Sequence, residues 1–360
     1  MLAGFVAPID RIADLGLLTG ARHAASVRAP RRPVFPNGAP NAWAVVDADT
    51  GRVIASAGAR QPLPPASLSK VLTALVAVDA MRPDTPVPVS RRAAGAPASR
   101  IGMKAGQTWS TEDALRAMLL VSANDAALAL AEKAGGPRGL AGFQERLAIL
   151  AKRLGLADKP VLRDPAGLDD QNAVAGGNKV SARDLAIVAR AALAQPRITA
   201  IVGVQQYKLR LPDGTSRQLI NHNKLLRTYP GLLGLKTGFT KKAGGCLLTV
   251  ARRNGRTMIA VVLATSDIYG TSRALLDFGF ATRTRDEPRA DALPKVPVST
   301  PPAAARKSST STTKGAGRGP GAGGGKAPPT RGAGTSGSRA PRPPAPPPVT
   351  TPPVRGSRRV

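Results

Sequence analysis

The chain has 360 residues, of which 42% are hydrophobic, and it carries a formal net charge of +30. This length and hydrophobic content allow one large domain or two, with a sizeable core. The single cysteine, Cys246, excludes an intrachain disulfide, and the two histidines, His23 and His222, do not have the spacing of a zinc site. We therefore expect neither metal catalysis nor a cofactor.

The C-terminal part of the chain differs in composition from the rest. From Ala292 onward it consists mainly of Pro, Gly, Ser, Thr and Ala with scattered Lys and Arg, and it has no acidic or aromatic residue. Such a segment cannot bury a core, so we expect residues 284–360 to form a disordered basic tail. Its charge favours polyanions such as anionic wall polymers or a membrane surface. Nucleic acid is not a favoured partner, because no aromatic residues interleave with the basic ones.

The N-terminus gives no convincing export signal. The apolar run at residues 1–8 has no basic residue before it, and Asp10 and Asp14 follow soon after. No stretch of the chain approaches the roughly 20 apolar residues that span a bilayer. Arginine and proline are frequent in residues 21–40, so we interpret residues 1–40 as an N-terminal segment and linker.

The first half of the following domain is predicted to be mostly helical. A β-hairpin over 43–55 turns at Asp49-Thr50-Gly51, and a buried helix follows from Ser67. Residues 83–103 are rich in Pro, Gly and Arg and are expected to be irregular. Helical periodicity then covers four stretches: 111–120, 124–134, 140–154 and 182–193. Ser181 is the expected N-cap of the last of them.

The second half changes to the period of strands. Strands are predicted over 204–211, 232–239, 246–250 and 257–264, with turns at Pro212-Asp213-Gly214 and Asn254-Gly255. A helix over 268–280 closes the domain. Strands at both ends of a helical middle predict an α+β domain over 41–283, in which the first and last strands meet in one antiparallel sheet and helices pack on it.

Ser67 and Lys70 are the first candidate site residues. They lie three residues apart at the start of an apolar helix, so both side chains point to the same side. A serine hydroxyl needs an adjacent base to act as a nucleophile, and an amine serves as that base only when burial or a nearby cation lowers its pKa. A helix-capping serine beside a surface lysine explains this spacing equally well.

Two further polar groups interrupt apolar segments. Ser122 and Asn124 lie between two helical runs, where they either face a cleft or satisfy a helix break through local hydrogen bonds. Lys236-Thr237-Gly238 lies within an apolar strand, and an edge-strand lysine is the plain alternative to a functional one. Thr237 is expected on the face opposite Lys236, and Gly238 leaves room for a ligand backbone.

Together and in this order, the three groups resemble the Ser-x-x-Lys, Ser-x-Asn and Lys-Thr-Gly motifs of penicillin-binding proteins and class A β-lactamases. The chain is most similar to the low-molecular-weight serine D-alanyl-D-alanine carboxypeptidases, peptidase family S11. The likeness covers about residues 41–280 and includes Gly167-Leu168-Asp169 and Asn223-Lys224-Leu225-Leu226. It implies the penicillin-binding-protein/β-lactamase-like transpeptidase fold, with an antiparallel sheet, flanking helices and a helical subdomain.

The resemblance also implies roles for the first motif pair. Ser67 attacks the carbonyl of a terminal D-alanyl-D-alanine bond of a peptidoglycan stem peptide, D-alanine leaves, and water hydrolyses the acyl-enzyme. A β-lactam occupies the same serine as a covalent inhibitor. Lys70 is the base, Ser122 relays a proton to the leaving nitrogen, and Asn124 orients Lys70 or the substrate amide.

The strand motif is implied to bind the substrate. Lys236 helps to keep Lys70 neutral and attracts the substrate carboxylate, while Thr237 donates a hydrogen bond to it. Gly238 lets the substrate backbone approach, and the backbone N–H groups of Ser67 and Phe239 form the oxyanion hole. The family also implies an extracytoplasmic location, because peptidoglycan lies outside the membrane.

Three alternatives remain open. A class A-like β-lactamase needs a deacylating carboxylate; Glu132 and Glu145 lie in helical runs outside the expected sequence context, and Asp164 and Asp169 are unsupported candidates. A Ser/His/Asp hydrolase is disfavoured because His222 is the domain's one histidine and Ser67 lacks a Gly-x-Ser-x-Gly context. A non-catalytic, polyanion-binding cell-wall protein is the third.

Overall fold

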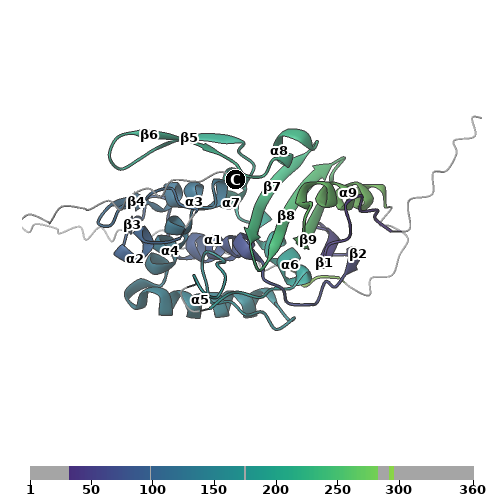
Figure 1. Ribbon diagram of the computed structural model, residues 1–360, viewed down its shortest axis with the longest axis horizontal. Coiled ribbons are helices and arrows are strands. Elements are labelled where there is room, and N and C mark those ends of the chain that lie inside the picture. Colours follow the sequence, from purple (N-terminus) through teal and green to yellow (C-terminus); the bar gives the residue numbers. More distant parts are fainter. Residues whose placement is uncertain (1–31, 98, 174–175, 283–291, 296–360) are drawn as a thin grey trace, which may run out of the picture. The chain divides into compact units, whose positions relative to one another are not determined.

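The computed structural model describes residues 32–97, 99–173, 176–282 and 292–295. A sheet and a group of helices lie beside each other, and strand β7 (Leu232–Thr240) of the sheet runs along the boundary between them (Figure 1). The expected N-terminal segment up to residue 31 and most of the expected basic tail lie outside the described residues.

The main sheet has five strands in the order β2-β1-β9-β8-β7, and every neighbouring pair is antiparallel. Its strands are β1 (Ala42–Asp47), β2 (Val53–Ala57), β7 (Leu232–Thr240), β8 (Gly244–Arg253) and β9 (Arg256–Thr265). The first and last strands of the domain, β1 and β9, pair as the sequence predicted. In this order β7 is an edge strand, so one of its sides is not covered by sheet pairing.

The hairpin between β8 and β9 has the predicted turn. Asn254 and Gly255 both have positive φ, +49° and +76°, which is the conformation that an Asn-Gly turn adopts most easily. Residues Gly245–Ala251 of β8 are all buried, because this strand is covered on both faces. A strand buried on both faces does not alternate between apolar and polar residues, so β8 shows little of the period-two pattern.

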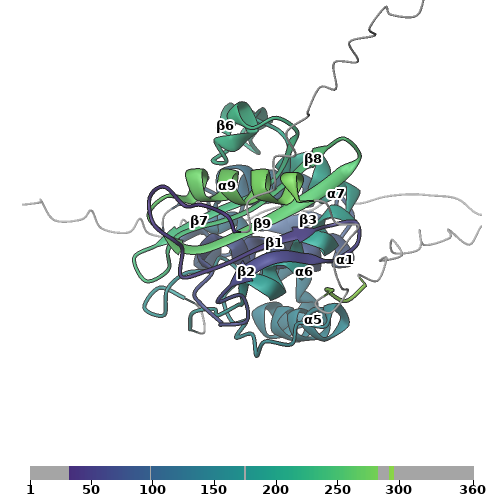
Figure 2. The ribbon, with the colours of Figure 1, turned by 90° about the vertical axis from the view of Figure 1, so that its right-hand side faces the viewer.

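Helices cover both faces of the sheet. Helix α9 (Ile268–Ala281) packs on one face, where Leu275 and Leu276 meet side chains of β8 and β9. Helix α6 (Ala182–Leu193) packs on the other face and belongs to the larger core that continues into the helical part. Figure 2 shows α9 and α6 on opposite sides of the strands.

The helical part is built around α1, all of whose first ten residues are buried. It contains a 3-10 turn (Ala66–Leu68), α1 (Ser69–Ala80), α3 (Thr111–Leu120), α4 (Asn124–Ala134), a second 3-10 turn (Gly136–Arg138) and α5 (Gly139–Leu154). Ser110 and Ser181 cap α3 and α6 by accepting the N–H of Asp113 and of Asp184. The predicted helices and the Ser181 cap are thus confirmed.

Several short elements were not predicted. The segment expected to be irregular, 83–103, contains β3 (Pro86–Pro88) and α2 (Arg91–Ala94), and β3 pairs with β4 (Thr108–Ser110). Helix α7 (Pro196–Val202) and helix α8 (Leu225–Thr228) were missed as well. Each is seven residues or fewer, which is too short for the hydrophobic pattern to repeat often enough to indicate a helix or a strand.

A separate two-stranded hairpin, β5 (Gln206–Arg210) and β6 (Ser216–Ile220), follows α7 and extends over α3 in Figure 1. Its turn is the predicted one: Gly214 has φ +85°, and Asp213 accepts hydrogen bonds from the backbone and hydroxyl of Thr215. Among the described residues, no single helix is long and apolar enough to cross a membrane; α6 and α7 pass that length and composition test only as a pair bent by 103°.

Residues 292–295 differ from the expectation that the whole of 284–360 is a free tail. Leu293 is buried in the larger core, and its N–H donates to the carbonyl of Gly51 at 2.7 Å. The Arg190 guanidinium donates to the carbonyls of Ala48 and Pro294. Leu293 thus belongs to the core of the domain, although composition assigned it to the tail.

Candidate active site

Ser67 lies in the tight turn that leads into α1. Pro65 begins the turn by accepting the N–H of Leu68, and Ala66 adopts a positive φ of +48°. Ser67 is half-buried, whereas its neighbours Ala66 and Leu68 are buried. The turn therefore presents the hydroxyl at the N-terminal end of a buried helix, where the helix dipole favours negative charge.

Lys70 is completely buried and lies between three oxygen atoms. Its Nζ is 2.8 Å from Ser67 Oγ, 2.7 Å from Asn124 Oδ1 and 2.6 Å from the carbonyl of Ala166. These contacts come from the 3-10 turn before α1, from α4 and from the loop before Leu168, so three separate segments fix the position of one amine. The spacing argument for Ser67 and Lys70 agrees with this geometry.

The environment of Lys70 favours its neutral form. Burial lowers the pKa of Lys70 well below its usual value, and the charge of Lys236 lowers it further. The carboxylates of Asp164 and Asp125 act in the opposite direction, but their effect is smaller. An amine held 2.8 Å from a serine hydroxyl can accept the hydroxyl proton when it is in its neutral form, which this environment favours.

Ser122 and Asn124 lie in the break between α3 and α4. Ser122 is buried and has a positive φ of +61°. The side chain of Asn124 joins two segments, because its Oδ1 accepts from Lys70 while its Nδ2 donates to the carbonyl of Pro97. The next residue, Asp125, accepts three consecutive backbone N–H groups, from Ile101 to Met103. The break is thus fixed against the loop that precedes β4.

Strand β7 carries Lys236, Thr237, Gly238 and Phe239. Lys236 is buried and donates to the carbonyl of Thr237 at 3.0 Å, and burial lowers its pKa to about 7. Lys236 pairs with Leu248 and Thr237 with Leu247, and these two leucines belong to different cores, so the side chains alternate as expected. The side chain of Phe239 is 72% exposed.

Gly238 brings β7 against the turn that carries Ser67. A Cβ atom at Gly238 would lie 3.1 Å from the backbone nitrogen of Ser67 and 3.1 Å from the Cβ of Ala66. This spacing is tighter than ordinary van der Waals contact, so the glycine lets the strand approach the turn closely. The predicted oxyanion donors, the N–H groups of Ser67 and Phe239, therefore belong to two backbone segments in contact.

The loop over residues 163–170 completes the surroundings of Lys70, and its role was missed at the sequence level. It supplies the Ala166 carbonyl, and its own shape is held by Asp164, whose Oδ1 accepts the N–H groups of Ala166 and Leu168. Buried Asn178 fastens the loop to α1 by donating to Ser69 Oγ. A backbone carbonyl has no signature in a sequence; only Gly167-Leu168-Asp169 marked this segment.

His222 also lies close enough to the site for its titration to be affected. Its backbone is fixed on both sides, since its N–H donates to the carbonyl of Leu120 and its carbonyl accepts from the hydroxyl of Tyr269. Burial lowers the pKa of His222, and the charges of Lys236 and Lys70 lower it further. A neutral imidazole is therefore expected beside the two lysines at neutral pH.

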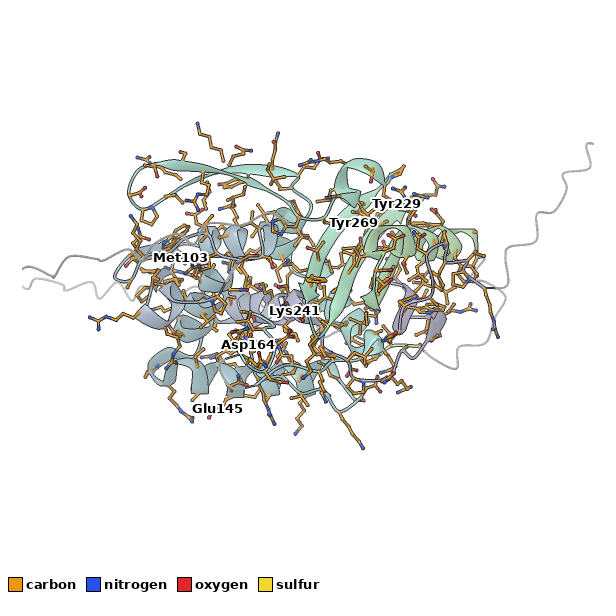
Figure 3. The ribbon with its side chains drawn as sticks, viewed as in Figure 1. Met103, Glu145, Asp164, Tyr229, Lys241 and Tyr269 are labelled. Carbon is orange, nitrogen blue, oxygen red and sulfur yellow. The ribbon has the colours of Figure 1, made fainter. Side chains whose placement is uncertain are left out.

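The four acidic residues considered for deacylation lie in different surroundings. Glu145 is on the outer side of α5, away from Asp164 in Figure 3, and it pairs with Arg138; Glu132 lies in α4. Asp164 binds backbone N–H groups, and Asp169 binds Thr240 and Lys242. Within the described ranges 32–97, 99–173, 176–282 and 292–295, no group of three His, Cys, Asp or Glu side chains is arranged to hold a metal ion.

The arrangement of sheet, helices and site defines the class of protein. A penicillin-binding protein homologue from Mycobacterium tuberculosis has a similar structure, with a TM-score of 0.67 and 30% sequence identity, covering 74% of this chain and 100% of that one. The predicted α+β fold of the penicillin-binding proteins and DD-peptidases is thereby confirmed.

The family is more specific. Residues 29–267 match the peptidase S11 family, described as D-alanyl-D-alanine carboxypeptidase. The chain belongs to this family of serine peptidases, as its motifs indicated. It is 31% identical to D-alanyl-D-alanine carboxypeptidase DacB2 of M. tuberculosis, over 69% of this chain and 84% of that protein. It is also 31% identical to DacF of Bacillus subtilis, but it spans only 61% of that protein's length.

Proposed function

We propose that this protein is a serine D-alanyl-D-alanine carboxypeptidase that removes the terminal D-alanine from peptidoglycan pentapeptides through an acyl-enzyme at Ser67. The observation that carries the proposal is the buried amine of Lys70, 2.8 Å from Ser67 Oγ and with a lowered pKa. Family membership supplies the class of substrate. Such an enzyme regulates how many stem peptides remain available for cell-wall cross-linking.

Acylation begins with proton transfer from Ser67 to Lys70. As the proton moves, Ser67 Oγ forms a bond to the carbonyl carbon of the penultimate D-alanine. The C–N bond to the terminal D-alanine then breaks, and Ser122 relays a proton to the leaving nitrogen. Asn124 keeps the Lys70 amine in line with the hydroxyl, since its Oδ1 lies 2.7 Å from Nζ.

Deacylation restores the serine. A water molecule adds to the ester carbonyl and gives a proton to neutral Lys70. Lys70 then returns a proton to Ser67 Oγ as the C–O bond of the ester breaks. In both steps the negative oxygen lies between the N–H groups of Ser67 and Phe239. One such donor is typically worth about 3 kcal/mol of transition-state stabilisation, so the close approach of Gly238 to Ser67 matters for rate.

The C-terminal carboxylate of the substrate is recognised by Lys236 and Thr237. The ammonium of Lys236 supplies positive charge, and the hydroxyl of Thr237 donates a hydrogen bond. Gly238 and Phe239 bind the substrate backbone along the open edge of β7. The buried position of Lys236 strengthens its attraction for an anion, because few water molecules screen it there.

Penicillin acylates Ser67 in the same way and is released slowly. A class A-like β-lactamase is the second candidate, but two observations count against it: Asp164 and Asp169 are engaged with backbone and side-chain donors, and Glu145 forms an ion pair with Arg138. Rapid deacylation of the class A β-lactamase type uses a carboxylate that is free to bind water. Hydrolysis of stem peptides is therefore the main activity.

The site of action is extracytoplasmic, at the cell wall, because that is where peptidoglycan stem peptides are found. The basic residues after Lys295 associate with anionic wall polymers or with a membrane surface, and nucleic acid is not a partner. Pull-down on insoluble wall material with and without residues 296–360 tests this; equal retention of both forms would contradict it.

Labelling with a fluorescent penicillin tests the catalytic proposal. Wild-type protein should carry one label, found by mass spectrometry on the peptide that contains Ser67, and Ser67→Ala should remain unlabelled. Ser216→Ala, which changes an exposed serine of β6, is the matched control and should label normally. Unlabelled wild type would favour the non-catalytic, wall-binding alternative.

The reaction itself is followed by mass analysis of a synthetic stem pentapeptide. Loss of one D-alanine is the expected result, and loss of that activity in Ser67→Ala assigns it to the serine. Cross-linked dimers in the same assay report any endopeptidase activity. A protein that hydrolyses penicillin rapidly but leaves the pentapeptide intact would be a β-lactamase.

A further inference from the structure

The turn that carries Ser67 is held between two glycines. A Cβ atom on Gly167 would lie only 1.9 Å from the carbonyl oxygen of Ala66, and one on Gly238 would lie 3.1 Å from the Cβ of the same alanine. The 163–170 loop and strand β7 therefore contact Ala66 from two sides through backbone atoms. Such contacts bring the segments close together, but they lack interlocking side chains that would fix one segment relative to the other.

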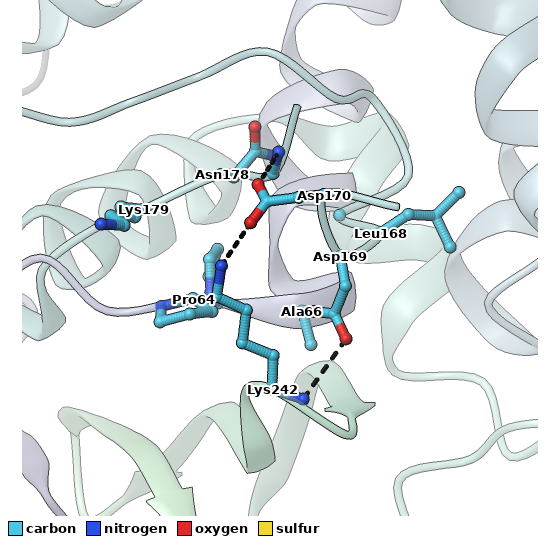
Figure 4. A pocket seen from close by; sticks show the side chains of 11 residues that line it. Pro64, Ala66, Leu168, Asp169, Asp170, Asn178, Lys179 and Lys242 are labelled. Atoms are coloured by element: carbon cyan, nitrogen blue, oxygen red, sulfur yellow. Dashed lines mark hydrogen bonds and ion pairs between the residues drawn. The ribbon is translucent and has the colours of Figure 1, made fainter. Parts of the chain in front are cut away.

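Asp169 joins these two segments directly. Its Oδ1 accepts the hydroxyl of Thr240 at 2.7 Å, and its Oδ2 accepts the backbone N–H of Lys242 at 3.3 Å. Thr240 is the last residue of β7, immediately after Phe239, and its hydroxyl in turn accepts the N–H of Ala243. Figure 4 shows the Asp169 carboxylate directed at Lys242, on one wall of a small pocket beside Ala66.

The other end of the loop is fixed to α1. Thr73 Oγ1 donates to the carbonyl of Pro165, Lys70 Nζ to that of Ala166, and Asn178 Nδ2 reaches Ser69 Oγ. The loop is therefore a rigid connection that starts at the helix of the nucleophile and its base. Asp169 is the point at which this connection reaches the strand.

Strand β7 needs such a connection because it is the edge of the sheet. Of the strands that the structure describes, β8 alone pairs with it, and the pairing ends at Thr240 opposite Gly244. Gly244 and Gly245 on the partner strand have no side chains to pack against the end of β7. The position of Phe239 relative to Ser67 then depends on what holds Thr240.

We infer that Asp169 is a positioning residue: by binding Thr240 and the N–H of Lys242, it sets the distance between the Phe239 end of β7 and Ser67. The inference rests on the proposed function, because Phe239 N–H matters only if an oxyanion forms beside Ser67. A misplacement of about 1 Å at a reacting centre costs on the order of 10²-fold in rate.

The neighbouring residue Asp170 provides a matched control. Its carboxylate pairs with the ammonium of Lys242 and accepts the N–H of Gly177, and both side chains of the ion pair are about half exposed. Exposed ion pairs contribute little to structure. Asp170 thus carries the same carboxylate as Asp169, one residue further along the chain. Its side-chain partner, Lys242, does not belong to β7, whereas Thr240, the partner of Asp169, does.

The effect of Asp169 should be geometric rather than electrostatic. The carboxylates that raise the pKa of Lys70 are Asp164 and Asp125, and Asp169 is not among them. Removing Asp169 should therefore lower the rate of acylation while the acid limb of the pH profile keeps its midpoint. A general loosening of the fold would instead lower the fraction of protein that can be labelled at all.

Stopped-flow acylation by a fluorescent penicillin, with rates taken per labelled site, tests the inference. For Asp169→Ala we expect the acylation rate constant to fall about 10- to 100-fold, the initial dissociation constant to stay within about twofold, and the acid midpoint to remain unchanged. Asp170→Ala should stay within about twofold of wild type in all three. If Asp169→Ala acylates like Asp170→Ala, or if its acid midpoint shifts, the inference is wrong.

Thr240→Val gives a second route that leaves Asp169 in place. It removes one hydroxyl, should reduce acylation in the same direction, and should add little further loss in the Asp169→Ala/Thr240→Val double variant. Losses that multiply would contradict a shared role, and this variant serves if Asp169→Ala fails to fold. Wild-type protein that takes no label would overturn the proposed function itself, an outcome separate from normal acylation in the Asp169 variants.

Discussion

The two lysines of the site are equally buried, but they are bound very differently. Lys70, on α1, lies within 2.8 Å of three oxygens contributed by three segments. Lys236, on β7, donates to one carbonyl, that of the adjacent Thr237. Burial lowers the pKa of both amines. Burial therefore favours the neutral form of both amines. The number of hydrogen-bond partners distinguishes them: Lys70 is held in place for proton transfer, whereas Lys236 still has N–H donors for a ligand.

The largest effect is expected from the fully bound lysine. Lys70→Ala removes the base and leaves Ser67 without a proton acceptor, so acylation by penicillin should fall by about 10²- to 10⁴-fold. Stopped-flow labelling measures this, with Lys152→Ala on the exposed side of α5 as the control. Acylation of Lys70→Ala within about tenfold of wild type would show that another group accepts the proton.

A smaller effect, mainly on binding, is expected from the other lysine. Lys236→Ala should weaken capture of the carboxylate about 10- to 100-fold, the range for a hydrogen bond to a charged group. It should also move the acid limb of acylation to higher pH, because the Lys236 charge lowers the pKa of Lys70 and its loss lets that pKa rise. Lys241→Ala, exposed on the same hairpin, should change neither; an unchanged pH profile in Lys236→Ala would mean that Lys236 does not control Lys70.

Asp164→Asn tests the same electrostatic argument with the opposite sign. Asp164 raises the pKa of Lys70, so the neutral amide should move the acid limb to lower pH. The N–H groups of Ala166 and Leu168 both donate to Asp164 Oδ1, and an amide oxygen can still accept these two bonds. We therefore expect less than about a tenfold change in the plateau rate. A shift to higher pH would contradict the assignment of charges around Lys70.

The smallest effect is expected at Cys246, where burial raises the pKa of the side chain instead of lowering it. Cys246 lies opposite Gly238 in the sheet, and burial raises the pKa of its thiol to about 11. The thiolate is the reactive form, so a thiol reagent at pH 8 should modify Cys246 only after unfolding. Cys246→Ala should acylate at a rate close to that of wild type. Rapid modification of the folded protein would show that this part of the sheet opens.

The parts of the molecule that the sequence revealed are those with local signals. The Asn254-Gly255 turn, the Ser181 cap and the alternation of Lys236 and Thr237 each depend on neighbouring residues, and each was predicted. The order of the three motifs also identified the family, because chemistry restricts which side chains can stand there. The spacing of Ser67 and Lys70 alone left a capping serine beside a surface lysine as an equal explanation, and only the other two motifs made the pair an active-site prediction.

What escaped prediction depends on distant pairing or on backbone atoms. The Ala166 carbonyl beside Lys70 is 96 positions from it in the chain, and any residue type supplies a carbonyl. Asp169 and Thr240 are 71 positions apart and were not connected by any pattern. The short helix α7 begins at Pro196, two residues after the end of α6, and no helix was predicted there.

The contact of Leu293 with the domain determines where the chain can be shortened. A chain that ends at residue 282, after α9, would expose to water the apolar surface beside Gly51 that Leu293 covers. It would also remove the Pro294 carbonyl, which accepts a hydrogen bond from the guanidinium of Arg190. Losing the burial of one leucine side chain lowers the free energy of unfolding by about 1.5 to 3 kcal/mol. A shortened chain for crystallisation or binding assays should therefore end after Lys295, so that Leu293 is kept.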